Sequence, residues 1–136
     1  MNYLLDTNIC IYLIKKHPPH VLQKFNSYSV GEIGMSAITV AELQYGVQKS
    51  QQSRQNQQAL EQFLIPLIIV DFDYTAATMY GSIRATLEAQ GVPIGPLDML
   101  IAAQALSLDL ILVTNNPKEF ARVPGLKIDN WARDGA

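Results

Sequence analysis

The chain is poor in cysteine and in charged residues, and it lacks any long hydrophobic run. A single cysteine, Cys10, among 136 residues excludes an internal disulfide and fits a reducing compartment. No apolar stretch approaches the ~20 residues that a helix needs to cross a bilayer, and Asp6 interrupts the apolar start too early for a secretory signal. We therefore expect a cytoplasmic protein that does not contact a membrane.

A surplus of positive charge is also missing. Ten Lys and Arg residues against twelve Asp and Glu residues give a net charge of −2, so any contact with nucleic acid must come from a local basic patch. The sequence has no glycine-rich phosphate loop, which leaves nucleotide-cofactor chemistry without support. His17 and His20 lie in a proline-flanked segment, so a Cys-His or Ser-His-Asp hydrolase is disfavoured.

The sequence alternates between short apolar runs and longer amphipathic segments. Hydrophobic residues make up 49% of the sequence, enough for one buried core, and residues 1–136 are predicted to form a single domain. Short apolar runs predict strands, and longer amphipathic segments between them predict helices. This alternation predicts an α/β fold with a central parallel sheet and helices on both faces. The predicted strands are 3–5, 33–36, 67–70 and 110–114, and the predicted helices are 7–16, 18–27, 39–49, 50–64, 74–90 and 97–108.

Polar residues follow the predicted strands at the edge where open parallel sheets place their ligands. They are Asp6-Thr7-Asn8, Ser36, and Thr114-Asn115-Asn116. Two further acids stand out, because Glu42 lies within an apolar helix and Asp98 opens a helix that is mostly apolar.

Each of the three acids also has a purely structural interpretation. Asp6 can cap a helix, Glu42 can pair loosely with Lys49, and Asp98 can interact with a helix N-terminus. However, carboxylates that cluster raise one another's pKa unless a cation offsets their charge. A hard divalent ion such as Mg²⁺, with Mn²⁺ as a substitute, is the natural partner for such oxygen ligands.

Four motifs, in the right order, resemble a known family. They are Leu5-Asp6-Thr7-Asn8, then Ser36-x-x-Thr39-x-x-Glu42-Leu43-x-x-Gly46, then Pro93-x-Gly95-x-x-Asp98-x-x-Ile101-Ala102-Ala103, and Val113-Thr114-Asn115-Asn116-x-x-Glu119-Phe120. Together they resemble the PIN-domain ribonucleases and, more narrowly, the VapC toxins of bacterial type II toxin-antitoxin systems. The resemblance runs from end to end, including the closing Val123-Pro124-Gly125-Leu126 and Asp129-x-Trp131.

The resemblance assigns roles to residues of this chain. It implies that Asp6, Glu42 and Asp98 hold Mg²⁺ in the active site. Asn116, which is also predicted to be catalytic, stands where many members have a fourth acid, and Glu119 is near enough in sequence to contribute. The polar residues expected to hydrogen-bond the carboxylates or to orient water are Thr7, Asn8, Ser36 and Thr114.

The resemblance also implies an activity and partners. The chain is expected to be a Mg²⁺-dependent endoribonuclease toxin in which a metal-activated water cleaves RNA, leaving a 3′-hydroxyl and a 5′-phosphate. The nearest subgroup cuts tRNA in the anticodon stem-loop, with initiator tRNA as its best-known target. A VapB-type antitoxin is expected to silence it. The residues that could contact RNA phosphates are Lys15, Lys16, Lys24, Arg84, Lys118 and Arg122.

Two alternatives stay open, together with one prediction on assembly. The neutral Asn116 and the acidic balance leave room for a PIN domain that binds RNA or protein without cutting. A receiver-type signalling domain would use Asp71 as phosphoacceptor, but the acidic pair expected at the end of its first strand is missing.

We also predict a homodimer, because two chains could join their basic patches. Apolar side chains are expected to be exposed on helices 9–14 or 60–64.

Overall fold

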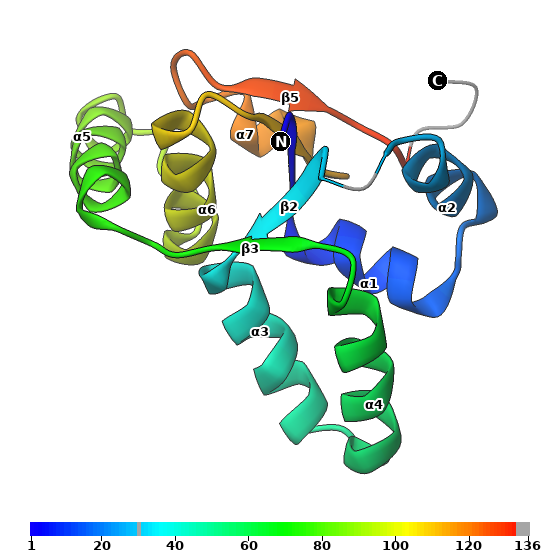
Figure 1. Ribbon diagram of the computed structural model, residues 1–136. Helices are drawn as coiled ribbons and strands as arrows, with labels where there is room; N and C mark the ends of the chain where they lie inside the picture. Colours follow the sequence, from blue (N-terminus) through cyan, green and yellow to red (C-terminus); the bar gives the residue numbers. More distant parts are fainter. Residues whose placement is uncertain (30, 133–136) are drawn as a thin grey trace.

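The computed structural model describes residues 1–29 and 31–132 and shows a five-stranded, fully parallel sheet (Figure 1). The strand order is β3-β2-β1-β4-β5, so β1 lies in the middle of the sheet. The strands are β1 (Tyr3–Leu5), β2 (Ile33–Ser36), β3 (Ile68–Val70), β4 (Ile111–Val113) and β5 (Lys127–Asp129).

The helices form two layers, one on each face of the sheet. One layer packs α5 and α6 against Leu4 and Leu112, and the other packs α1 to α4 around Leu5 and Met35. In Figure 1, α5 and α6 stand side by side, while α3 and α4 project together from the opposite side of β3. The helices are α1 (Thr7–Lys15), α2 (Pro19–Asn26), α3 (Ala37–Gln48), α4 (Ser53–Leu64), α5 (Tyr74–Ala89), α6 (Pro96–Ser107) and α7 (Pro117–Phe120).

The α/β fold with a parallel sheet and helices on both faces is confirmed. Successive side chains of a central strand point to opposite faces, so Leu4 and Leu5 enter different cores and both are fully buried. On α6, the fully buried Ala102, Ala103 and Ala105 carry small side chains that allow the helix to lie close to the sheet. The apolar periodicity of the sequence thus reflects these two cores.

The strand order creates a switch point between β1 and β4. The chain builds β1, β2 and β3 outward in one direction, then crosses through α5 and α6 to β4 on the other side of β1. Leu5 pairs with Val113 at the carboxyl ends of these two strands. Ligands of open α/β sheets bind at such a point, and the residues that follow are Asp6 and Thr114.

The prediction of four strands was incomplete, because β5 and the short helix α7 were missed. Strand β5 contains one apolar residue, Ile128, between Lys127 and Asp129, which is too little for a pattern of alternating hydrophobicity to register. It forms because β4 offers an open edge, with Val113 paired to Asp129. The helix predicted from residue 39 begins at Ala37, because the Ser36 side chain caps it.

The prediction of exposed apolar side chains on helices 9–14 and 60–64 was wrong at its main positions. Ile9, Leu13 and Leu60 are buried in the core. The exposed apolar side chains include two on the edge strand β3, where Ile68 is 39% and Ile69 is 44% exposed. Among the described residues, no helix is long and apolar enough to span a membrane.

Candidate active site

Asp6 lies directly after the central strand and is almost completely buried. Its Oδ1 accepts a 2.9 Å hydrogen bond from the amide of Ile9, so Asp6 caps α1 as the structural interpretation required. Burial raises the pKa of Asp6 to about 6, hydrogen bonds from the Thr114 hydroxyl and the Ile9 amide oppose that rise, and the charges of Asp98 and Glu42 add to it. A cap needs neither burial nor neighbouring acids, so capping alone does not explain this environment.

Glu42 reaches the same place from α3. Its Oε1 accepts a 2.6 Å hydrogen bond from the hydroxyl of Thr7, the residue after Asp6. This bond holds the carboxylate next to the start of α1 rather than toward Lys49, whose ammonium instead lies 5.0 Å from the centre of the Tyr45 ring. The predicted role of Thr7, to hydrogen-bond a carboxylate, matches this geometry.

Asp98 comes from the first turn of α6 and is half-buried. Its pKa is raised first by burial and then by the charges of Glu119 and Glu42. Gly95 caps the same helix, and a Cβ atom there would lie 3.4 Å from Oδ2 of Asp98. Glycine therefore leaves room around this carboxylate.

The loop after β4 supplies the remaining predicted residues. The Thr114 hydroxyl, which bonds Asp6, also accepts a 2.9 Å hydrogen bond from the amide of Asn116. The Asn116 side chain makes no capping bond to α7. Glu119, in the first turn of α7, is close enough to Asp98 to raise its pKa. Glu119 is thus the acid that this loop contributes.

The sequence analysis gave no role to Asn115, although it follows a strand, and it missed Tyr12. The Asn8 amide donates to Oδ1 of Asn115 at 3.4 Å, and the Asn115 amide donates to the Tyr12 hydroxyl at 2.7 Å. These bonds tie α1 to the loop that carries Asn116. Asn8 therefore contacts another amide rather than a carboxylate, and the apolar surroundings of Tyr12 in the sequence had concealed its hydroxyl as a partner.

Ser36 does not bond a carboxylate either. Its buried hydroxyl donates to Oε1 of Gln104 at 2.9 Å and accepts from the amide of Ile38 at 3.1 Å. The expectation that Ser36 directly supports the acids is therefore not what the structure shows. Gln104 was not singled out in the sequence because it lies within an apolar helix.

The donors at this site suit a hard divalent cation. Asp6, Glu42, Asp98 and Glu119 offer only oxygen atoms, which Mg²⁺ and Mn²⁺ prefer. In the described part of the chain, no three His, Cys, Asp or Glu side chains are gathered tightly enough to form a complete metal site by themselves. Burial is the main cause of the raised pKa values of Asp6 and Asp98, and the charges of the neighbouring acids add to it, so the acids lie near enough to repel one another. Their joint ligation of one ion stays a prediction.

Comparison with known proteins agrees with this geometry. A family model described as the PIN domain matches residues 3–126. The chain belongs to the PIN-domain family. It is 45% identical over 132 residues to the tRNA(fMet)-specific endonuclease VapC of Shigella flexneri, an alignment that covers 97% of this chain and 99% of the relative. It is 46% identical to ribonuclease VapC2 of Rickettsia felis, with 96% and 98% covered. Within the PIN family it is therefore a member of the VapC ribonucleases.

Solved structures extend the similarity to three dimensions. The chain superimposes with a TM-score of 0.91 and 45% identity on a chain of VapBC2 from Rickettsia felis bound to a promoter DNA fragment, covering 96% of this chain and 99% of that one. A DNA-bound VapBC from Salmonella typhimurium gives a TM-score of 0.92 at 42% identity, with 97% and 99% covered. This similarity removes the receiver-type alternative and leaves Asp71 as an exposed acid beyond the edge strand.

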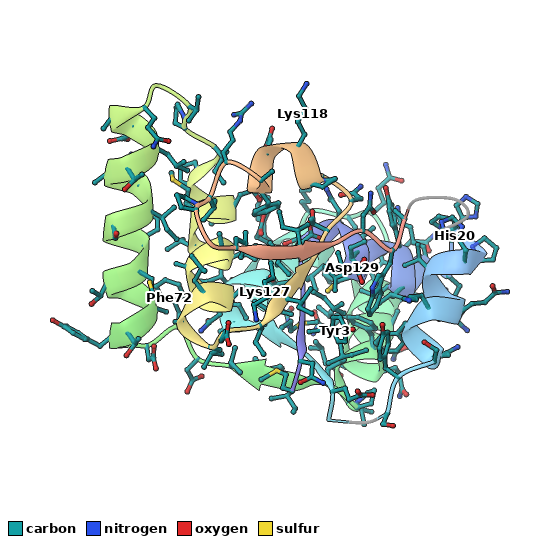
Figure 2. All side chains as sticks on the ribbon, turned by 90° about the horizontal axis from the view of Figure 1, so that it is seen from above. Tyr3, His20, Phe72, Lys118, Lys127 and Asp129 are labelled. Carbon is teal, nitrogen blue, oxygen red and sulfur yellow. The ribbon has the colours of Figure 1, made fainter. Side chains whose placement is uncertain are left out.

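The six basic residues predicted to contact RNA differ in how free they are in this VapC-family chain. Arg84 is engaged by Glu88 and the Tyr80 hydroxyl on its own helix. Lys118, on α7 beside Glu119, points away from the protein (Figure 2). Lys15 and Lys16 end α1, Lys24 lies 5.7 Å from the centre of the Tyr28 ring, and Arg122 donates to the Pro93 carbonyl.

A cavity of about 310 Å³ opens beside Glu42, between α1, α3 and α4. Its walls are mainly apolar, and Lys15 and Glu42 are the charged residues that line it. Gly46 also lines it, and a Cβ atom there would meet nothing within 4 Å. The carboxylate site therefore continues into an apolar groove. The apolar lining residues are Ile11, Ile14, Leu43, Val47, Ala59 and Leu60.

Proposed function

We propose that this chain is a metal-dependent endoribonuclease toxin that hydrolyses RNA phosphodiester bonds at the switch point of its sheet. The observation that supports the proposal is that three acids from three separate elements lie near enough for their charges to affect one another's pKa. Asp6 follows β1, Glu42 comes from α3 and Asp98 comes from α6. The charges of other acids contribute to the raised pKa values of both Asp6 and Asp98. Folding places like charges together at a cost, and a bound cation would offset that cost.

The chain's own residues have defined parts in the proposed reaction. A divalent cation, when bound, supplies charge stabilisation of the scissile phosphate and acidifies a water molecule. Asp6, Glu42 and Asp98 would hold it. Thr7 orients the Glu42 carboxylate, and Thr114 orients that of Asp6. With Asn116 neutral, Glu119 is a further acid whose charge acts on Asp98, and it could accept a proton or contact the ion.

The proposed substrate is tRNA, specifically the anticodon stem-loop of initiator tRNA. Support comes from the Shigella flexneri relative, which is named a tRNA(fMet)-specific endonuclease and is 45% identical. Lys118 lies on α7 next to Glu119 in the sequence and points away from the protein, and lysines bind phosphates as point charges. This substrate places the activity in the cytoplasm.

The experiment compares cleavage of total tRNA by the wild-type protein and by Asp98→Asn, with Mg²⁺ and with EDTA. We expect cleavage only by the wild type with Mg²⁺. The matched control is Asp71→Asn, which makes the same change at the end of another strand, where the acid is exposed. If Asp98→Asn cuts as fast as Asp71→Asn, the acids are not catalytic. If the wild type binds RNA but never cuts it, the non-cleaving alternative is correct.

We propose further that a VapB-type antitoxin inserts apolar side chains into the groove beside Glu42 and a cationic side chain toward the acids. The solved relatives are VapBC complexes, and a carboxylate cluster attracts Arg or Lys. Gly46→Leu fills the groove and should weaken inhibition by the cognate antitoxin while cleavage continues. The control is Gly81→Leu on α5, where a Cβ also meets nothing within 4 Å. Equal inhibition of both variants contradicts this docking site.

A further inference from the structure

The buried polar side chains of this protein are gathered near the acids. Within the described residues, five polar or charged side chains are buried: Asp6, Ser36, Thr39, Gln104 and Thr114. Asp6 and Thr114 belong to the site already described. The other three lie where the start of α3 meets α6, the helices that carry Glu42 and Asp98.

Gln104 is the member of this group that joins the two helices. It is 1% exposed, on the same helix as Asp98, and its Oε1 accepts the 2.9 Å hydrogen bond from the Ser36 hydroxyl. Ser36 is fully buried and caps α3 through the Ile38 amide. One side-chain bond thus connects the cap of the Glu42 helix to the C-terminal half of the Asp98 helix.

We infer that Gln104 is a positioning residue for the acidic site: it fixes the separation of Glu42 and Asp98 by pinning the N-terminus of α3 to α6. This inference rests on the proposed function. A polar side chain at this depth is costly unless it is bonded, and an apolar residue would fill the same place in α6, whose other buried members include Met99 and Ile101. A directional bond sets a distance between two helices that apolar packing alone leaves adjustable.

The position of the bond explains how it acts on the acids. Glu42 lies on α3, six residues after its cap Ser36, and Asp98 lies six residues before Gln104 on α6. Glu42 is already close enough to Asp98 to raise its pKa. Loss of the bond frees one helix relative to the other, so the two carboxylates no longer keep the spacing that a single cation requires.

The test variant is Gln104→Met, which keeps the length of the side chain and removes its hydrogen-bonding groups. The stability control is Ile83→Val, a buried residue of α5 in the core shared with α6 and far in sequence from the acids. Both variants are compared with the wild type for Mn²⁺ affinity by titration without RNA, for the thermal unfolding midpoint, and for kcat and KM on tRNA.

We expect Gln104→Met to weaken Mn²⁺ binding by about 10-fold, the lower range for losing a residue that orients a ligand, whereas Ile83→Val keeps the wild-type affinity at a similar loss of midpoint. Cleavage by Gln104→Met should recover at about ten times more Mn²⁺, with an unchanged KM for tRNA. The double variant Ser36→Ala/Gln104→Met should lose no more Mn²⁺ affinity than whichever of the two single variants loses more, because both substitutions remove the same hydrogen bond.

The results separate the inference from the proposed function. If Gln104→Met binds Mn²⁺ as tightly as the wild type while its midpoint falls, Gln104 only stabilises the fold and the inference is wrong. If both variants lose affinity equally, general loosening is the cause and the inference is again wrong. If the wild type itself neither binds Mn²⁺ nor cuts tRNA, the proposed function fails and the inference fails with it.

Discussion

The hydroxyl of Thr7 donates a 2.6 Å hydrogen bond to Oε1 of Glu42, a residue 35 positions further along the chain. The bond crosses from α1 to α3 and brings the Glu42 carboxylate beside Asp6. Glu42 is the one charged residue of α3, and this bond explains why it turns toward the end of the central strand.

Thr7→Val keeps the shape of the side chain and removes the donor. We expect cleavage at a fixed, subsaturating Mg²⁺ concentration to fall by about 10- to 100-fold, because an unheld carboxylate binds the ion less well. The control is Thr78→Val on α5, whose exposed hydroxyl bonds only the Tyr74 carbonyl within its own helix. Initial rates measured across a Mg²⁺ series test this, and equal rates for both variants would refute the role of Thr7.

The raised pKa of Asp6 predicts how the metal-free protein responds to pH. Its folded pKa of about 6 lies above the ordinary value of 3.8 for an aspartate, so the folded state holds this proton more tightly than the unfolded chain. Stability is therefore greatest below about pH 4 with respect to this group and declines as pH rises through about 6, by up to about 3 kcal/mol. Asp98, whose pKa is also raised, changes stability in the same direction.

Denaturant unfolding in EDTA between pH 4 and 7.5 measures this dependence. Asp6→Asn should flatten it, and the variant should be more stable than the wild type at pH 7, since asparagine retains an oxygen that can cap α1. Adding Mg²⁺ should stabilise only the wild type at pH 7. If the free energy of unfolding of the wild type rises steadily from pH 4 to 7, the folded protein does not raise the pKa of Asp6.

We predict that replacing Thr39 with valine stabilises the protein. Its hydroxyl is fully buried on α3 and has no hydrogen-bond partner among the described residues. Thr39→Val removes the unsatisfied group and keeps the branched shape, so the free energy of unfolding should rise by about 1 kcal/mol or more. Calorimetry of the two proteins would check this. A fall in stability would mean that the hydroxyl is bonded in solution.

We predict that the expected homodimer forms through the exposed apolar side chains around β3. Strand β3 is at the edge of the sheet, and Ile65 is 75%, Ile69 44% and Tyr74 87% exposed. An open strand edge with such a surface favours association. Ile69→Lys should convert a dimer into a monomer in light scattering. Leu108→Lys, at 42% exposure on a different part of the surface, is the control and should remain dimeric.

Much of this protein could be predicted from local sequence, for definable reasons. The strands 3–5 and 33–36 are short apolar segments, so burial alone identifies them. Asp6 and Asp98 were recognisable because an acid directly after a strand or at the start of a helix interrupts an apolar context. The parallel order followed from the alternation of elements, and the four motifs indicated the PIN family.

The sequence alone determined the type and order of the main elements and the acids at their ends, because these depend on periodicity and on interruptions visible within a few residues. Only the tertiary structure decided which groups meet. β5 exists because β4 leaves an edge to pair with, and Ser36 bonds Gln104 across 68 positions rather than a carboxylate. The side that exposes apolar residues was likewise set by β3 becoming an edge strand. Contacts between residues distant in the chain depend on how whole elements pack, and no local pattern encodes that packing.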